Sequence, residues 1–161
     1  LEPVCIPILL AGVDAEAFGS IKPLFDDYIR AFVDWDLEAA RAMIDFWFGP
    51  SAFQHLPGPV RDFLVKSTAS NVHDVRASFR ERYSPEAMRK LDMPVRLVYG
   101  SKSPDASYRV ASTVAALAPK GSLVKVDGAT HALTATHSGE VAELIAALAT
   151  QSADGGQPEK V

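Results

Sequence analysis

His131 is the residue of this chain whose type and setting best suit acid–base chemistry. It lies in the stretch KVDGATHAL (125–133), just after a short apolar run and a glycine. An imidazole titrates near neutral pH, so it can accept a proton from a hydroxyl nucleophile and return that proton to a leaving group. The alternative interpretation is a surface histidine on a loop between a strand and a helix. The elements that surround the loop must decide between the two.

The other histidines indicate no further chemistry. His137 follows His131 by six positions, with Glu140 as a possible third ligand and no cysteine nearby, so we expect no metal site. His55 and His73 fall in a region with helical periodicity, where a polar-face position explains each of them. No G-x-G-x-x-G or P-loop motif occurs in the sequence, and we expect no cofactor.

Composition excludes several classes of protein. The 161 residues carry 16 basic and 20 acidic side chains and a formal charge of −4, so we expect no nucleic-acid partner. The apolar run 4–10 is too short to span a bilayer and lacks the basic leader and cleavage site of a secretory signal, so we expect no membrane partner. Cys5, the single cysteine, excludes an internal disulfide and favours a cytoplasmic protein.

The first half of the chain has the periodicity of helices. From residue 15 to about residue 91 the apolar side chains recur at three and four positions, which predicts a helical block. Its clearest helix is DWDLEAARAMIDFWFG (34–49), which Asp34 or Asp36 could cap and which Gly49 ends. Aromatic side chains concentrate in this block: Trp35, Phe46, Trp47, Phe48, Phe53 and Phe63.

The second half has the order strand, helix, strand, helix. PVRLVYG (94–100) and SLVKVDG (122–128) are predicted strands, SYRVASTVAALA (107–118) is the helix between them, and the last helix begins at Ser138. This order is typical of a right-handed parallel crossover whose sheet is covered on both faces. The segment IPILL (6–10) is predicted to add a third strand. The polar, glycine-rich tail 151–161 is predicted to be disordered.

This frame resembles the C-terminal half of an α/β-hydrolase. The resemblance runs from about Glu2 to Thr150 and rests on EPV, PVRLVYGSKSP and SLVKVDGATHALTATHSGEV. It implies a partial α/β-hydrolase sheet of about three parallel strands with a helical cap insertion. Residues 1–14 would be the remnant of the family's sixth strand, 15–91 the cap, and 92–150 the C-terminal part of the core. In this family the cap roofs an apolar acyl or alcohol pocket.

The resemblance implies roles for particular residues. His131 matches the family's general base. Family members commonly carry the catalytic acid three residues after the glycine that ends the seventh strand, but here that position is Ser103. Asp105 lies two residues further on, where it could instead cap a helix. Some members carry the acid after the sixth strand, which corresponds to Glu2. Glu2 and Asp105 remain equal candidates at this point.

The nucleophile of the family is missing from the sequence. No G-x-S-x-G elbow occurs in the 161 residues, and in the family that motif would precede residue 1. The resemblance therefore implies the C-terminal portion of a serine-type, esterase-like hydrolase for an ester, amide or related small carbonyl substrate, inactive without its N-terminal half. An alternative is a non-catalytic interaction module that forms a homodimer or binds a second chain through an open strand edge. A further alternative is an α/β domain whose resemblance to the family is accidental.

Overall fold

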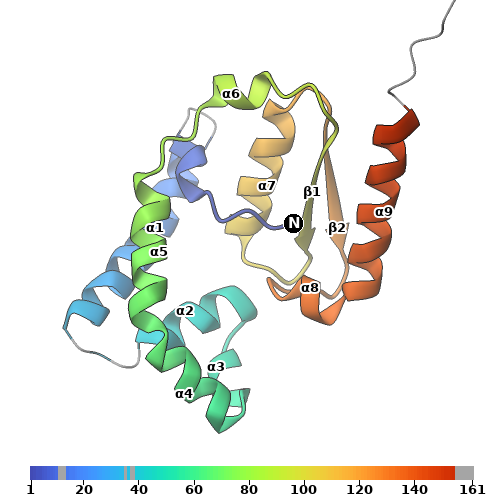
Figure 1. Ribbon diagram of the computed structural model, residues 1–161. Helices are drawn as coiled ribbons and strands as arrows, with labels where there is room; N and C mark the ends of the chain where they lie inside the picture. Colours follow the sequence, from blue (N-terminus) through green and yellow to red (C-terminus); the bar gives the residue numbers. More distant parts are fainter. Residues whose placement is uncertain (11–13, 35, 37–38, 155–161) are drawn as a thin grey trace, which may run out of the picture.

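The fold combines a small parallel sheet with a larger helical part. The computed structural model describes residues 1–10, 14–34, 36 and 39–154 (Figure 1). Strands β1 (Val95–Gly100) and β2 (Gly121–Val126) pair in parallel, from Val95 opposite Gly121 to Gly100 opposite Val126. Helix α7 (Asp105–Leu117) makes the crossover between them. The predicted strands, their parallel pairing and the helix that connects them are confirmed.

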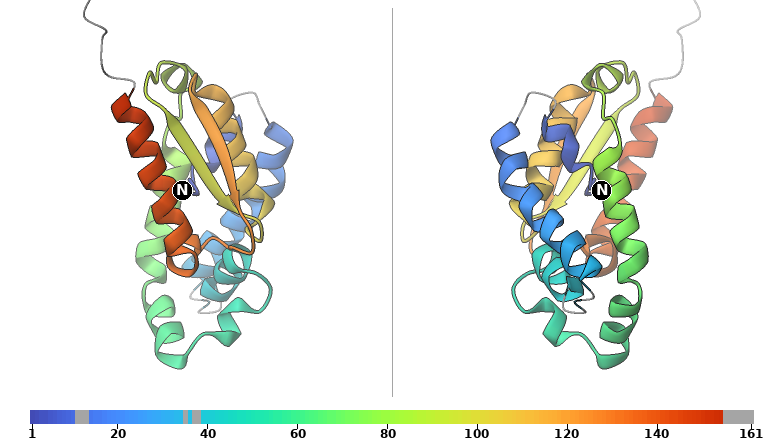
Figure 2. Two further views of the ribbon diagram at one scale, coloured as in Figure 1. Left: turned by 90° about the vertical axis from the view of Figure 1, so that its right-hand side faces the viewer. Right: turned by 90° about the vertical axis from the view of Figure 1, so that its left-hand side faces the viewer.

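Helices cover both faces of the sheet. Helix α7 packs against both strands on one side, and α9 (Ser138–Asp154) lies on the other side (Figures 1 and 2). Side chains of β1 alternate between these faces, as the pleat of a strand requires. Leu97 belongs to the larger apolar core, which includes α7, whereas Val98 belongs to a smaller core that includes α9. Both faces are therefore buried, as parallel strands require.

The predicted helical block is present between the first residues and the sheet. Its members are α1 (Ala15–Val33), α2 (Ala39–Phe48), α3 (Ala52–His55), α4 (Gly58–Lys66), α5 (Thr68–Arg80) and α6 (Pro85–Arg89). Helices α2, α3 and α4 lie below the sheet in Figure 1, whereas α6 lies above it. Local signals explain several ends. The side chain of Asp14 accepts a hydrogen bond from the Ala17 amide at the start of α1, and Ser84 does the same for Ala87 at the start of α6. Helix α2 stops before Gly49, whose φ of 107° suits only glycine well.

The predicted third strand is wrong. Residues Ile6–Leu10 form a short 3₁₀ helix, η1, rather than a strand. Pro7 supplies no N–H to a strand ladder, and the amide of Ile8 bonds to the carbonyl of Cys5 in a turn. Ile8 and Leu9 are adjacent and both fully buried, whereas a strand would direct them to opposite faces. The short helix instead packs against α1, α5 and α7, and the described residues contain a sheet of two strands.

Two other boundaries differ from expectation. Helix α9 continues through Asp154, so the predicted disordered tail cannot begin at residue 151, and residues 155–161 lie outside the described part. Asp34 ends α1 instead of capping the next helix. The amide of Ala39 bonds to the carbonyl of Asp36 at the start of α2. Trp35 also lies outside the described residues. No helix in the described ranges combines the length and apolar character needed to cross a membrane.

Candidate functional site

The structure brings Glu2 and His131 together. Glu2 lies in the N-terminal segment and His131 in the loop after β2, and the Glu2 Oε2 atom is 2.5 Å from the His131 Nδ1 atom. The Glu2 side chain is 2% exposed and the His131 side chain 22% exposed, so the carboxylate is enclosed while the ring reaches the surface of a cavity. A buried carboxylate thus orients a more accessible imidazole.

Three further donors hold the Glu2 carboxylate in place. The Gly100 amide, at the end of β1, donates to Oε1 over 2.7 Å, and the Ser103 hydroxyl donates to the same oxygen over 2.5 Å. The hydroxyl of Ser107, in the first turn of α7, donates to Oε2 over 2.9 Å. With His131, four groups from separate elements bond to one carboxylate, which fixes its orientation.

These hydrogen bonds govern the ionisation of Glu2. Burial by itself would raise the pKa of a carboxyl group, because the charged form loses hydration. Hydrogen bonds to the carboxylate outweigh that effect, and the pKa of Glu2 falls from 4.5 to about 2; the donors are His131, Gly100, Ser103 and Ser107. Glu2 is therefore ionised at neutral pH and accepts hydrogen bonds only.

The ionised partner determines which nitrogen of His131 carries the proton. Because a carboxylate is only an acceptor, Nδ1 of His131 must be the donor of their hydrogen bond. In the neutral ring, Nε2 then has a free lone pair and can accept a proton. Among the described residues, none forms a hydrogen bond with Nε2. This is the tautomer that a general base needs.

Backbone and side-chain bonds fix the loop that carries His131. Gly128 adopts a φ of 77°, which makes the turn after β2, and its amide donates to the Ser101 hydroxyl over 2.8 Å. The Lys102 amide donates to the Ala129 carbonyl over 2.8 Å. The loop after β2 is thereby tied to the loop after β1, where Ser103 contacts Glu2.

Two aromatic side chains from the end of α2 lie over His131. The rings of Trp47 and His131 stack with their centroids 4.3 Å apart and an interplanar angle of 26°. The ring of Phe48 lies at 6.0 Å from that of His131. Trp47 also packs edge-on against Phe25 of α1, which belongs to the large core. Stacking against Trp47 of the helical block thus limits the orientations that the His131 ring can adopt.

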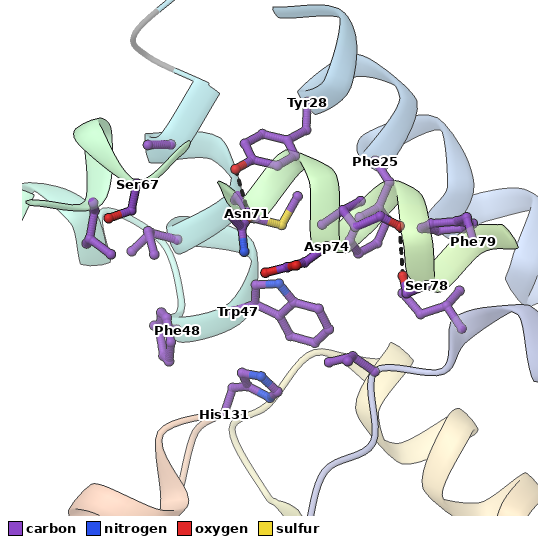
Figure 3. Close-up of a pocket in the computed structure, with 17 residues that line it drawn as sticks. Phe25, Tyr28, Trp47, Phe48, Ser67, Asn71, Asp74, Ser78, Phe79 and His131 are labelled. Atoms are coloured by element: carbon purple, nitrogen blue, oxygen red, sulfur yellow. Dashed lines mark hydrogen bonds between the residues drawn. The ribbon is translucent and has the colours of Figure 1, made fainter. Parts of the chain in front are cut away.

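A cavity of about 380 Å³ opens beside His131 (Figure 3). Residues of α1, α2 and α5 form most of its wall, and His131 lies at one end. Most of the lining is apolar, including Phe25, Met43 and Trp47. The predicted aromatic cluster is divided: Trp47 and Phe48 line the cavity, whereas Phe63 is 67% exposed on α4. A small organic molecule bound there would lie next to the imidazole.

Asp105 does not contact His131. It is the first residue of α7, its side chain is 67% exposed, and it pairs with Arg109 one turn later. Arg109 also bonds to Asp14, with Nη1 2.5 Å from Oδ2. These carboxylates raise the pKa of Arg109 above its ordinary value. The expected helix cap at Asp105 is wrong, because Pro104 occupies the cap position of α7 and no side chain caps this end. Glu2 is the acid that the structure pairs with His131.

The remaining histidines lie apart from this pair. His137 Nδ1 is 2.8 Å from the Thr136 hydroxyl, and His55 Nδ1 is 2.7 Å from the Ser51 carbonyl oxygen. His73 is exposed on α5. In the part of the chain that the structure describes, no three His, Cys, Asp or Glu side chains are grouped as metal ligands.

Sequence reasoning missed the residues that support Glu2. Ser103 and Ser107 are separated by four positions, a spacing that places both on one side of a helix start, but serines are too common for this to predict a carboxylate site. In the sequence, Trp47 is only one of several aromatic residues of the helical block. Its contact with His131 depends on how α2 packs, which no local pattern indicates.

Comparison with known proteins gives no relative. No protein-family model, curated protein or solved structure matches the chain.

Proposed function

We propose that this chain supplies the acid, the general base and the substrate-covering helices of a serine-type α/β-hydrolase. The single observation that supports this most strongly is the bond between the buried carboxylate of Glu2 and Nδ1 of His131. A carboxylate that binds Nδ1 of an imidazole beside a cavity and leaves Nε2 unbonded is the acid–base arrangement of hydrolases with a Ser-His-Asp or Ser-His-Glu triad. The substrate would be an ester, an amide or a related small carbonyl compound.

In the proposed reaction, His131 moves one proton in each direction. Nε2 takes the proton of a serine hydroxyl while the serine oxygen bonds to the carbonyl carbon of the substrate. The imidazolium then gives that proton to the alcohol or amine that leaves, and an acyl-enzyme remains. Water repeats the sequence and releases the acid. Glu2 stays ionised throughout and stabilises the imidazolium, in keeping with its pKa of about 2.

The nucleophile and the oxyanion donors belong to polypeptide outside these residues in this proposal. Three features of the chain support such an arrangement. The imidazole faces a mainly apolar cavity, helices cover that cavity, and the His131 loop follows a parallel strand next to the strand whose end binds Glu2. In an open parallel sheet, ligands bind at the carboxyl ends of the strands, which is where both residues lie.

Hydrolysis by the complete product of the gene tests the proposal. We expect p-nitrophenyl esters or anilides to be hydrolysed by that product, and His131→Ala to lower kcat/KM by about a thousandfold or more. His137→Ala is the matched control, because it removes another histidine close in sequence that does not contact Glu2. This 161-residue chain alone should show no turnover that depends on His131. Equal activity of the two complete variants, or His131-dependent turnover by the 161 residues alone, contradicts the proposal.

The edge of the sheet supports a second candidate, an interaction module. Among the described strands β1 pairs with β2 only, so its other edge can accept a further strand. This candidate predicts a homodimer or a complex with a second chain. Light scattering that shows a stable monomer at micromolar concentration contradicts the homodimer.

A further inference from the structure

Helix α5 and the residue that precedes it contribute a line of polar groups to the cavity beside His131. Ser67, Asn71, Asp74 and Ser78 all line it, and they follow one another at intervals of four, three and four residues. This spacing places them on one side of α5. The opposite wall carries Trp47 and Phe48 from α2 (Figure 3). The cavity thus has a polar side facing an aromatic side.

Asn71 presents a hydrogen-bond donor to the cavity. The Tyr28 hydroxyl donates to Asn71 Oδ1 over 2.7 Å. This bond engages the oxygen of the amide, and the Asn71 nitrogen therefore points away from Tyr28, toward Trp47 (Figure 3). The buried Tyr28 fixes which end of the amide a bound molecule meets.

Asp74 places a negative charge on the same side of the cavity. Its carboxylate points toward Trp47 (Figure 3). The lining contains no lysine or arginine, and its other ionisable side chains are Tyr28 and His131. Because Glu2 already holds Nδ1 of His131, the histidine does not balance the charge of Asp74. No basic side chain of the described residues forms an ion pair with Asp74.

A carboxylate facing aromatic rings in a mainly apolar cavity suits an organic cation. The carboxylate attracts the charge, and the face of an indole or phenyl ring stabilises a cation placed over it. Asp74 is partly open to solvent, so a neutral ligand gains nothing from its charge, whereas an anionic ligand would be repelled by it. The lining therefore discriminates by charge as well as by shape.

We propose that the cavity binds a substrate that carries a protonated amino group, with the ammonium at Asp74 and the apolar part against Trp47 and Phe48. This inference rests on the proposed hydrolase function and adds a substrate class to it. The reacting carbonyl lies at the His131 end of the cavity. The substrates are accordingly esters or amides whose acyl or leaving group bears an alkylammonium.

Binding of ligands that cannot be hydrolysed tests the substrate class separately from catalysis. Hexylammonium, hexanol and hexanoate are titrated against the chain by calorimetry. We expect hexylammonium to bind about tenfold more tightly than hexanol, hexanoate to bind more weakly than either, and added salt to weaken only the hexylammonium complex. Asp74→Asn should abolish the preference for hexylammonium. The matched control is Asp62→Asn, which removes an exposed carboxylate of α4 that does not line the cavity.

Several results would overturn the inference. These are equal affinity for hexylammonium and hexanol, a preference that survives in Asp74→Asn, or no binding of any probe at millimolar concentration. If circular dichroism shows that Asp74→Asn does not fold, the effect of salt on hexylammonium binding by the unsubstituted chain tests the same charge. His131→Ala should keep the preference. Failure of the hydrolase proposal would leave the binding preference intact, whereas failure of this inference would leave His131-dependent hydrolysis intact.

Discussion

The carboxylate of Glu2 and the imidazole of His131 meet at 2.5 Å although they are 129 positions apart in the sequence. The helical block lies between them in the chain and folds back so that Trp47 stacks on the same imidazole. Glu2, His131 and Trp47 therefore come from three distant parts of the sequence. Their association depends on the whole fold, so substitutions at this site should change the stability of the fold as well as its activity.

The ionisation of Glu2 predicts a loss of stability in acid. The pKa of Glu2 is about 2 in the folded chain, against 4.5 as its ordinary value. A carboxyl group whose pKa is lowered by folding stabilises the folded state above its unfolded pKa, and that stabilisation disappears as the pH falls through the folded pKa. We expect Glu2→Gln to be less stable than the unsubstituted chain at pH 6, with the difference shrinking by about 3 kcal/mol toward pH 2. Urea unfolding followed by circular dichroism measures it.

Glu140→Gln is the matched control for this comparison. It removes the same type of charge from an exposed position in the first turn of α9. We expect its stability relative to the unsubstituted chain to change little over the same pH range. If the difference between Glu2→Gln and the unsubstituted chain is independent of pH, the hydrogen bonds to Glu2 do not control its ionisation.

Substitution of Ser103 tests one of the hydrogen bonds that the Glu2 carboxylate accepts. Its hydroxyl lies 2.5 Å from Glu2 Oε1, at the position where the α/β-hydrolase pattern led us to expect an aspartate. Ser103→Ala removes one hydrogen bond to a charged group and should cost about 2 kcal/mol. Ser103→Asp places a second carboxylate against the first, so at pH 7 it should lower the free energy of unfolding by more than Ser103→Ala does. Near pH 3 the loss caused by Ser103→Asp should be smaller than its loss at pH 7. Equal stability of the two variants at pH 7 would show that this serine does not face an ionised Glu2.

Substitution of Gly100 tests the close approach between the end of β1 and the loop after β2. A Cβ atom at this position would lie 2.4 Å from the Ala129 carbonyl oxygen and 2.9 Å from the Ser103 hydroxyl. Backbone cannot move aside as a flexible side chain can, so we expect Gly100→Ala to lower the free energy of unfolding by about 1 to 3 kcal/mol. Gly139→Ala is the control, because a Cβ atom there meets nothing within 4 Å and alanine favours the helix. Unchanged urea midpoints for Gly100→Ala would contradict the close contact.

Local sequence patterns predicted the elements better than their association. Alternating and β-branched residues marked β1 and β2, and the proline and glycine positions marked several helix ends. The same rules failed for Ile6–Leu10, where a run of apolar residues is compatible with a strand or with a buried short helix. Burial of adjacent side chains against three helices decided the outcome, and a window of five residues does not contain that information.

The choice between Glu2 and Asp105 also required the fold. Both are acidic residues next to predicted strand or helix ends, and the sequence ranked them equally. Three groups besides His131 bond to the Glu2 carboxylate, and they belong to β1, to the loop after it and to α7. Asp105 instead found Arg109 one turn away on its own helix. Asp105 and Arg109 are four positions apart, a spacing at which ion pairs form on a helix. No spacing in the sequence indicates that three donors meet at Glu2.

The most direct test of the central claim is the hydrolytic kcat/KM of the complete gene product with Glu2→Gln, His131→Ala, both substitutions, and Asp105→Asn. The account predicts losses of about a hundredfold or more for Glu2→Gln and about a thousandfold or more for His131→Ala. The double variant should be little worse than His131→Ala alone, because the two residues act as a unit. Asp105→Asn should change kcat/KM by less than about threefold. A large loss in Asp105→Asn together with near-normal activity in Glu2→Gln would contradict the account.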